Sequence, residues 1–456
     1  MKRISKKNAS GNSIYMKVAV VVLGSLFLLA NHNQASNRQV SAENIPLKET
    51  LEADFTETDA VEKKSAETEN TVDNITETKP FKFSGKIQIH IQSDGYRGLF
   101  HDRLIVGTEE RKEYYQAGDG TNVVLSPEAF HTEALTVYSL NRTCGNPRYH
   151  GTLHITDRPE GLLLTNEVEL EDYLQGVLPS EMPAGYPEEA LKAQAVCART
   201  YVLYQQLQGA VLDDSTNFQV YNNVAPDERC NAAIAATAGE ILSDGKGNPA
   251  EIYYYSTSAL DEAERSENWY RWEYANEQMS AVNLATRINS CQPGTIREPS
   301  KCKFYGMEIT VHREDGRAQE LELSTTEGTV CVVGEYAIRL VLCDGVSKAV
   351  LQGGTEVTME KLIPSGFFSM ETIQKGKFMI GYRLSGGGFG HGNGMSQNGA
   401  KAYANQGESY EEILARYYPD LKLENSWRLP WISARNLIKR TLRRMLPASL
   451  FSCFCP

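Results

Sequence analysis

Alternating polar and apolar residues mark the start of the ordered part of the chain. In the run 86–91, Ile87, Ile89 and Ile91 fall on one face, which is the pattern of a strand with one buried side. Short apolar runs follow, each set off by Gly, Pro or Asp, at 104–106, 123–125, 135–137 and 153–155. The pattern therefore predicts a β-rich N-terminal region over residues 81–150.

The clearest predicted helix begins after Pro187 and runs from about residue 188 to 208. Proline is tolerated in a first helical turn because its missing N–H would have no partner there. Glu188 and Glu189 follow, where the helix dipole favours negative charge, and Gly209 closes the segment. A second helix is predicted over 410–418, ending at Pro419.

Between these helices the chain again has a β-like pattern. Strand-like runs occur at 307–311 and 338–342, and we expect an inserted β-rich segment near 290–365. The stretch 385–399 that follows is too rich in glycine for a regular strand or helix.

Both ends of the chain differ in composition from this body. Basic residues precede the apolar run 18–30, so 1–35 is predicted to be an export signal. The run is shorter than the ~20 residues that span a bilayer, which favours a cleaved signal peptide over a membrane anchor.

Residues 36–80 read as a disordered acidic linker. Residues 421–456 read as a basic amphipathic tail, either lying on a membrane or solvated. The chain is thus expected to be exported, and either secreted or anchored.

Length and composition set the class of protein. A chain of 456 residues exceeds the size of one usual core, and 41% hydrophobic with 23% charged residues is ordinary for a globular protein. We therefore expect an α+β fold, with mixed strands and helices in a two-lobed body with a cleft, preceded by the disordered acidic linker. The net charge of −12 argues against nucleic acid as a partner.

Nine cysteines in an exported chain permit disulfides. The two local pairs that would close short loops are Cys291 with Cys302 and Cys331 with Cys343, and free thiols are the equal alternative. No Cys-x-x-Cys pair has zinc-finger spacing.

Glu181 is the first candidate for chemistry. It is flanked by Pro179 and Pro183, which predict a rigid non-helical turn. A carboxyl beside the apolar Leu178 and Met182 would have its pKa raised towards neutral, as a general acid requires. The alternative is a surface turn with no chemical role.

The glycine-rich segment is the second candidate. Its glycines permit close approach of the backbone to a ligand, and His391 and Gln397 place donors and acceptors beside that backbone. No Gly-Lys-Ser/Thr follows, so a phosphate loop is excluded. A flexible turn is the alternative.

Two stretches carry a family resemblance. Residues 166–183, continuing through 189–201, and residues 388–400, followed by 407–419, resemble the signatures of the stage II sporulation protein D and amidase-enhancer family. The resemblance covers about 139–419, and 151–420 is identified as the family-like catalytic domain.

The resemblance implies a lytic transglycosylase that cleaves peptidoglycan glycan strands between N-acetylmuramic acid and N-acetylglucosamine. Glu181 would protonate the glycosidic oxygen and then accept the proton of the muramic C6 hydroxyl, giving a 1,6-anhydro end without a cofactor. The process would be spore engulfment or other wall remodelling, with a cell-wall amidase and a membrane protein as further partners. The alternatives are a non-catalytic, glycan-binding enhancer of an amidase and a hydrolysing muramidase.

By the same resemblance, eight further residues would line a sugar cleft: Gln194, Arg199, Tyr201, Ser256, Gly388, His391, Ser396 and Gln397. Some relatives bind zinc through a Cys and a His, but the matching stretch 212–221 contains neither, so no metal is predicted. Ala259-Leu260 also replaces the family's Gly-Gly turn.

Overall fold

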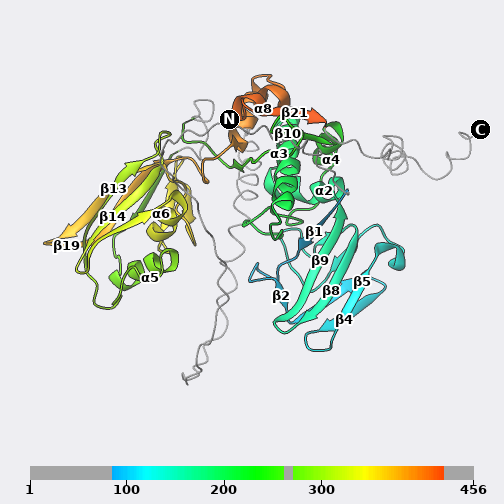
Figure 1. The fold of residues 1–456 in the computed structure, drawn as a ribbon, viewed down its shortest axis with the longest axis horizontal. Coiled ribbons are helices and arrows are strands. Elements are labelled where there is room, and N and C mark those ends of the chain that lie inside the picture. The colour runs from blue at the N-terminus through cyan, green and yellow to red at the C-terminus, as the bar shows by residue number, and fades with distance from the viewer. Residues whose placement is uncertain (1–84, 261–270, 426–456) are drawn as a thin grey trace, which may run out of the picture.

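The computed structural model describes residues 85–260 and 271–425. It has an α+β fold in two lobes that lie side by side (Figure 1), which confirms the predicted fold class. The predicted export signal, the acidic linker and the tail beyond residue 425 lie outside the described residues.

The first lobe begins with two antiparallel sheets. One has the order β1-β9-β8-β5 with β2 paired to β9, and the other has the order β4-β3-β6-β7. The inward isoleucines of β1, Ile87 and Ile89, are fully buried, as the alternation predicts. The elements are β1 (Lys86–His90), β2 (Phe100–His101), β3 (Arg103–Gly107), β4 (Lys112–Gln116), β5 (Asn122–Leu125), the 3₁₀ turn η1 (Pro127–Phe130), β6 (Leu135–Val137), β7 (Arg148–Tyr149), β8 (Thr152–Arg158) and β9 (Gly161–Glu169).

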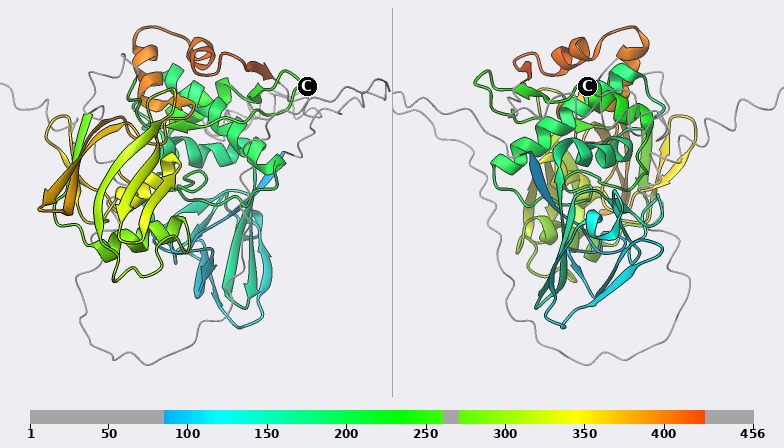
Figure 2. Two further views of the ribbon diagram at one scale, coloured as in Figure 1. Left: turned by 60° about the vertical axis from the view of Figure 1, so that its left-hand side comes forward. Right: turned by 90° about the vertical axis from the view of Figure 1, so that its right-hand side faces the viewer.

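Helices from two separate parts of the chain, residues 170–236 and 397–417, complete this lobe. The predicted long helix is α3 (Glu188–Leu207), which packs against α2 (Leu170–Glu181) and α4 (Glu228–Ala236). From the C-terminal end, α7 (Gln397–Asn405) and α8 (Tyr410–Tyr417) lie against α3 (Figure 2). Buried alanines on α3 permit this close packing. Strands β10 (Glu240–Ser243) and β21 (Lys422–Asn425) form a separate antiparallel pair.

The second lobe is inserted between β11 (Tyr254–Tyr255) and β20 (Met395–Ser396) and has its own core, from Trp272 to Leu384. It therefore extends beyond the range 290–365 suggested by the pattern. A sheet of order β17-β16-β12-β19-β18 lies with a sheet β13-β14-β15 and two helices. These elements are β12 (Arg271–Asn276), α5 (Ala281–Cys291), β13 (Phe304–His312), β14 (Ala318–Thr325), β15 (Gly328–Val333), α6 (Glu335–Leu342), β16 (Lys348–Leu351), β17 (Glu356–Thr358), β18 (Phe368–Lys375) and β19 (Phe378–Gly387).

Two local predictions in this lobe are wrong. Residues 338–342 form the end of α6 rather than a strand. Its buried residues Ile338, Val341 and Leu342 share one helix face, and Arg339 is paired with Glu335 one turn earlier. The glycine-rich segment is also partly regular, because its first glycines lie in β19 and its last residues begin α7.

Of the two alternatives for the cysteines, the structure shows free thiols rather than the two candidate disulfides. All seven described cysteines are free thiols, and Cys343, one of the four proposed partners, is buried with its thiol donating to the Met359 carbonyl at 3.2 Å. Cys331 is exposed on β15. The remaining Cys453 and Cys455 lie outside the described residues.

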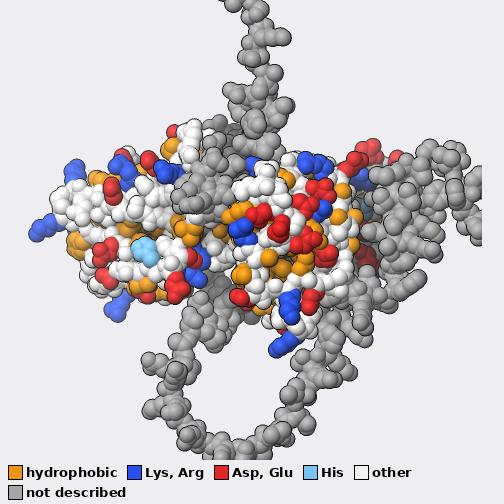
Figure 3. Space-filling view, turned by 90° about the horizontal axis from the view of Figure 1, so that it is seen from above, with side chains coloured by type: hydrophobic (Ala, Val, Ile, Leu, Met, Phe, Trp, Pro, Cys, Tyr) orange, Lys and Arg blue, Asp and Glu red, His pale blue; other side chains and the backbone are white. Residues whose placement is uncertain are grey.

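The face seen in Figure 3 carries many acidic side chains on the right-hand lobe. Such a surface repels phosphate backbones, in line with the net charge. Among residues 85–260 and 271–425, no helix is both long and apolar enough to cross a membrane.

Gly176 of α2 tests the packing of the helical layer. A Cβ there would lie 2.3 Å from the Asn222 Oδ1 and 2.6 Å from a ring carbon of Tyr221. Ala normally gains about 1 kcal/mol over Gly inside a helix, but overpacking costs about 1–3 kcal/mol. We expect Gly176→Ala to lower the denaturant midpoint.

Gly185→Ala is the matched control, because a Cβ there meets nothing within 4 Å. Its midpoint should equal that of the wild type. A Gly176→Ala protein more stable than the wild type would contradict this packing.

Candidate functional site

Glu181 is the last residue of α2 and does not sit on a non-helical turn. Pro179 lies inside the helix, so the prediction that the two prolines keep Glu181 out of helical conformation is wrong. The helix nonetheless ends directly afterwards, with Met182 at φ −131° and ψ 133°, because a residue that precedes a proline avoids the helical region. Pro183 thus fixes the point at which the acid leaves the helix.

The carboxyl of Glu181 has an apolar setting. Leu178 and Met182 are buried, and the only described hydrogen bond to the carboxyl comes from the Val220 N–H, which donates to Oε1 at 2.6 Å. Desolvation raises the pKa of Glu181 from 4.5 to about 7, and the Val220 hydrogen bond opposes this rise because it stabilises the carboxylate. The raised pKa expected of an acid catalyst is therefore a property of this site.

Tyrosines form the titratable surroundings of Glu181. The charge of Glu181 acts on the hydroxyls of Tyr173 on α2, Tyr201 on α3 and Tyr254 on β11. Burial raises the pKa of Tyr201 to about 12, so this phenol is neutral at physiological pH. Among the described residues, no charged side chain shifts the pKa of Glu181.

Gln219 joins these tyrosines and was not predicted. Its side chain is fully buried; its Oε1 accepts from the Tyr173 hydroxyl at 3.2 Å, and its Nε2 donates to the Tyr254 hydroxyl at 2.9 Å. The resemblance covers the stretch 212–221, which ends in Gln219-Val220-Tyr221, but it gave Gln219 and Val220 no role in the site.

Gln397 brings the two predicted signatures together. Its Nε2 donates to the Glu181 carbonyl at 3.2 Å and lies 3.5 Å from the Gln194 Oε1. Gln194 is fully buried on α3, and its Nε2 has no hydrogen-bond partner among the described residues. The glycine-rich segment thus contacts both Gln194 on α3 and the backbone of the candidate acid Glu181 at the end of α2.

The glycines of this segment hold it against β11 and the residues after it. At Gly394 (φ 74°) a Cβ would lie 1.8 Å from the Tyr253 carbonyl oxygen, and at Gly388 (φ 76°) 2.8 Å from the Thr257 carbonyl oxygen. Only glycine fits both the positive φ and the close approach. The segment is therefore a fixed element at these positions.

His391 is a positioning group in this segment. Its Nδ1 accepts from the Asn393 N–H at 3.1 Å, so its Nε2 carries the proton and donates to the Tyr254 carbonyl at 3.1 Å. Burial, with Arg339 and Arg317 nearby, lowers the pKa of His391 to about 4. Arg317 of the second lobe also donates to the His391 carbonyl. His391 is thus neutral with both ring nitrogens engaged.

Ser256 and Ser396 lie where the chain leaves the first lobe after β11 and returns to it at β20. The Ser396 hydroxyl accepts from the Gly399 N–H at 3.2 Å, which caps α7. It also lies 3.4 Å from the Ser256 carbonyl. Both residues belong to the parallel pairing of β11 with β20 or its continuation, so their observed contacts hold the segment in place.

Arg199 has no described contact with Glu181, Gln397 or His391. Its guanidinium is fully buried and forms a two-point pair with Glu171, with both N–O distances 2.8 Å. It also donates to the Glu240 carbonyl at 3.1 Å. Its observed role is to fasten α3 to α2 and β10, in contrast to the sugar contact implied by the resemblance.

A pocket of about 270 Å³ lies beside α2, lined in part by Gln175, Asn222 and Asn231, and Glu181 is not among its lining residues. Within the described ranges, no three His, Cys, Asp or Glu side chains are grouped as metal ligands.

This arrangement can be set beside known proteins. A family model described as "Stage II sporulation protein" matches residues 158–243, which contain Glu181 and Val220. A second model, described as a domain of unknown function, matches residues 256–394, which contain the second lobe.

Three curated relatives are similar to the chain. The amidase enhancer of Bacillus subtilis (strain 168) is 27% identical over 284 residues, 55% of this chain and 40% of the relative. Stage II sporulation protein D of the same organism is 28% identical over 280 residues, 57% of this chain and 75% of the relative. Its counterpart in Bacillus amyloliquefaciens is 27% identical over 283 residues, again 57% and 75%.

The segment 158–243 therefore matches the stage II sporulation protein domain. The match over residues 158–243 and the similarity to relatives named stage II sporulation protein D and amidase enhancer confirm the resemblance that the two signatures carry. The match spans less than half of the amidase enhancer's own length.

The raised pKa of Glu181 predicts how stability depends on pH. The folded state binds the proton more tightly than the unfolded state between pH 4.5 and about 7, so stability falls as pH rises through this window. Relative to Glu181→Gln, which cannot ionise, the wild type should lose about 2 kcal/mol across it, a figure discounted for the partial exposure of the residue.

Denaturant unfolding at several pH values measures this difference. Glu109→Gln, on an exposed turn, is the control and should follow the wild type. A constant difference between Glu181→Gln and the wild type from pH 4 to 8 would refute the raised pKa.

The ion pair between the buried Arg199 and the partly exposed Glu171 predicts a stability effect. Arg199→Met leaves Glu171 without its partner and should cost about 3 kcal/mol, whereas adding Glu171→Gln should recover part of the loss. Urea unfolding of the two single variants and the double variant measures this coupling. Full stability of Arg199→Met together with weakened glycan binding would instead favour a role in sugar contact.

Proposed function

We propose that this protein is a lytic transglycosylase that cleaves the glycan strands of peptidoglycan at the bond between N-acetylmuramic acid and N-acetylglucosamine, leaving 1,6-anhydro ends. The observation that carries the proposal is the Glu181 carboxyl, with a pKa of about 7 and no charged group among the described residues acting on it.

A single carboxyl is sufficient for this reaction. Ordinary glycosidases use two carboxyl groups about 5–9.5 Å apart, because one protonates the leaving oxygen and the other activates water or attacks the sugar. Among the described residues, no second carboxylate shifts the pKa of Glu181, whereas the hydroxyls of Tyr173, Tyr201 and Tyr254 all sense its charge. This setting supports an intramolecular reaction over hydrolysis.

The proton balance of the proposed reaction closes on Glu181. The neutral carboxyl gives its proton to the glycosidic oxygen as the bond from muramic C1 to that oxygen breaks. The C6 hydroxyl of the same sugar then attacks C1, and the carboxylate accepts the hydroxyl proton. The carboxyl is regenerated, no water is consumed, and the Val220 N–H, at 2.6 Å from Oε1, stabilises the transient carboxylate.

The second candidate is a non-catalytic enhancer of a cell-wall amidase. It is favoured by the name of one relative, the amidase enhancer. In that case the protein would bind glycan without cleaving it, and Glu181 would have no catalytic role.

The test is product analysis of denuded glycan strands and intact sacculi by mass spectrometry. Wild type should release 1,6-anhydro ends. Glu181→Gln keeps the shape but removes the acid, so its rate should fall by a factor of 10² or more, while glycan pull-down persists.

Three outcomes separate the alternatives, with Glu109→Gln as the control of unchanged activity. Anhydro ends that depend on Glu181 support the proposal. Reducing ends indicate a hydrolysing muramidase, and the absence of any cleavage together with retained glycan binding and amidase stimulation indicates an enhancer.

A further inference from the structure

The loop of residues 214–223, which follows α3, faces Glu181. It carries Val220, whose N–H is the described hydrogen-bond donor to the carboxyl. Both ends of this loop contact one short turn of the N-terminal β region, Arg142 to Gly145. The turn is closed by its own backbone, with the Arg142 N–H donating to the Gly145 carbonyl at 2.8 Å and the reverse bond at 2.9 Å. We refer to it as the clamp turn.

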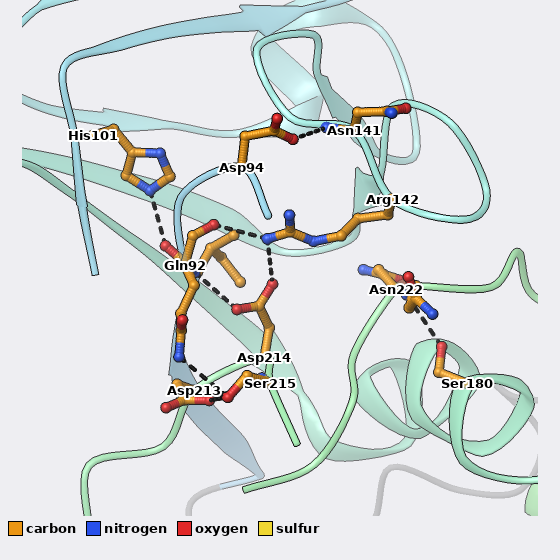
Figure 4. Close-up of polar contacts among 12 residues, drawn as sticks. Gln92, Asp94, His101, Asn141, Arg142, Ser180, Asp213, Asp214, Ser215 and Asn222 are labelled. Carbon is orange, nitrogen blue, oxygen red and sulfur yellow. Dashed lines mark hydrogen bonds and ion pairs between the residues drawn. The ribbon is translucent and has the colours of Figure 1, made fainter. Parts of the chain in front are cut away.

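The first end of the loop is Asp214. Its carboxylate accepts from the Arg142 Nη2 at 3.0 Å and from the Gln92 N–H at 2.8 Å, and Arg142 also donates to the Gln92 carbonyl at 2.7 Å. Figure 4 shows the three residues converging. The Arg142 and Asp214 side chains are 1% and 0% exposed. A buried two-sided contact of this kind fixes the position of Asp214.

The second end of the loop is Asn223. Its Oδ1 accepts from both the N–H and the hydroxyl of Thr143 at 3.1 Å, and its carbonyl accepts from the Cys144 N–H at 2.8 Å. The Asn223 N–H donates to the Ser180 hydroxyl at 3.1 Å. The same clamp turn therefore holds this end too, against the residue next to Glu181.

The ends determine where Val220 lies. The Tyr221 N–H donates to the Asp214 carbonyl at 3.3 Å, and the Asn222 N–H donates to the Gly176 carbonyl at 3.1 Å. Asn222 has φ 53°, in the left-handed region that non-glycine residues rarely adopt. Such backbone persists only where its surroundings hold it, and it is concentrated at functional sites.

We propose that the clamp turn is a positioning element for the acid: Arg142 and Thr143 hold both ends of the loop 214–223 and so place the Val220 N–H against the Glu181 carboxyl. This inference rests on the proposed function for its consequence in catalysis. Its structural part does not, because the position of the N–H can be measured without any reaction.

The energetics of Arg142 favour this role over a purely structural one. Its Nε and Nη1 are buried without a hydrogen-bond partner among the described residues, and buried ion pairs rarely stabilise more than a well-packed apolar side chain would. The clamp turn also lies outside both segments that match family models, 158–243 and 256–394. With the clamp turn as a positioning element, the N-terminal β region is part of the site.

The groups that face Glu181 leave its titration simple to interpret. Tyr173, Tyr201, Tyr254 and, from the loop before β2, Tyr96 all sense its charge. Burial raises the pKa of each of them above the ordinary value of a tyrosine, so they remain neutral. A change in the Glu181 titration therefore reports hydration and the Val220 hydrogen bond.

The experiment is a carbon-13 NMR titration of the Glu181 carboxyl in the full chain, with the signal identified by its loss in Glu181→Gln. In Arg142→Met the pKa should move by about half a unit or more. It rises if the carboxyl stays dry without its donor, and it falls if the loop opens to water. The rate of anhydro-end release should drop about tenfold, with its pH profile displaced by the same amount.

Thr143→Val removes only one hydroxyl and keeps the proposal testable should Arg142→Met fail to fold; a smaller shift of the same sign is expected. Leu284→Ala, in the core of the second lobe, is the control for destabilisation alone and should leave the titration unchanged. An unchanged Glu181 titration in folded Arg142→Met and Thr143→Val overturns the proposal. If the titration shifts but the wild type releases no anhydro ends, the clamp stands and the proposed function fails.

Discussion

One hydrogen bond, from the Val220 N–H to the Glu181 carboxyl, governs the balance of this site. Desolvation alone would keep the carboxyl protonated and so unable to donate at a useful rate, because the carboxylate left behind would have no support. The single donor lowers that cost without making the carboxylate the resting state, and the pKa lies at about 7 as a result. Desolvation is the larger of the two effects, so the carboxyl has the raised pKa that a general acid near neutral pH requires.

Much of the fold can be understood as the means of holding that pair of groups. The helix α2 ends at the acid because Pro183 follows. The ion pair between buried Arg199 and Glu171 connects α3 to α2, and Gln397, at the start of α7, contacts both the Glu181 carbonyl and Gln194. The chain leaves the first lobe after β11 and returns through the glycine-rich segment to β20. The second lobe therefore contributes to the site through Arg317 and the backbone it holds, since Arg317 donates to the His391 carbonyl.

The parts of the structure that were predictable from the sequence are those with a local signal. The alternation of polar and apolar residues predicted β1. Pro187, the acidic pair that follows it and Gly209 predicted the bounds of α3. The motif residues Glu181 and Gln397 do meet, as two signatures of one family would. The apolar run 338–342 was wrongly predicted to be a strand, because a short apolar run is compatible with both helical and strand periodicity. The ion pair that supports α6, between Arg339 and Glu335, joins residues one helical turn apart and gives no signal within the run itself. Gln219, Val220 and Arg142 were not found, since each acts through contacts across long sequence separations. Arg199 shows the converse: it lies in the signature, and the contact observed for it is the ion pair with Glu171.

The most direct test of this account is the pKa of Glu181 in the wild-type protein, read from the carbon-13 shift of its carboxyl as pH is varied. We expect a midpoint at about 7, with the neutral acid substantially populated at physiological pH. A midpoint near the ordinary value of 4.5 would mean that the carboxyl is hydrated and ionised, and it would contradict the role of Glu181 as the acid.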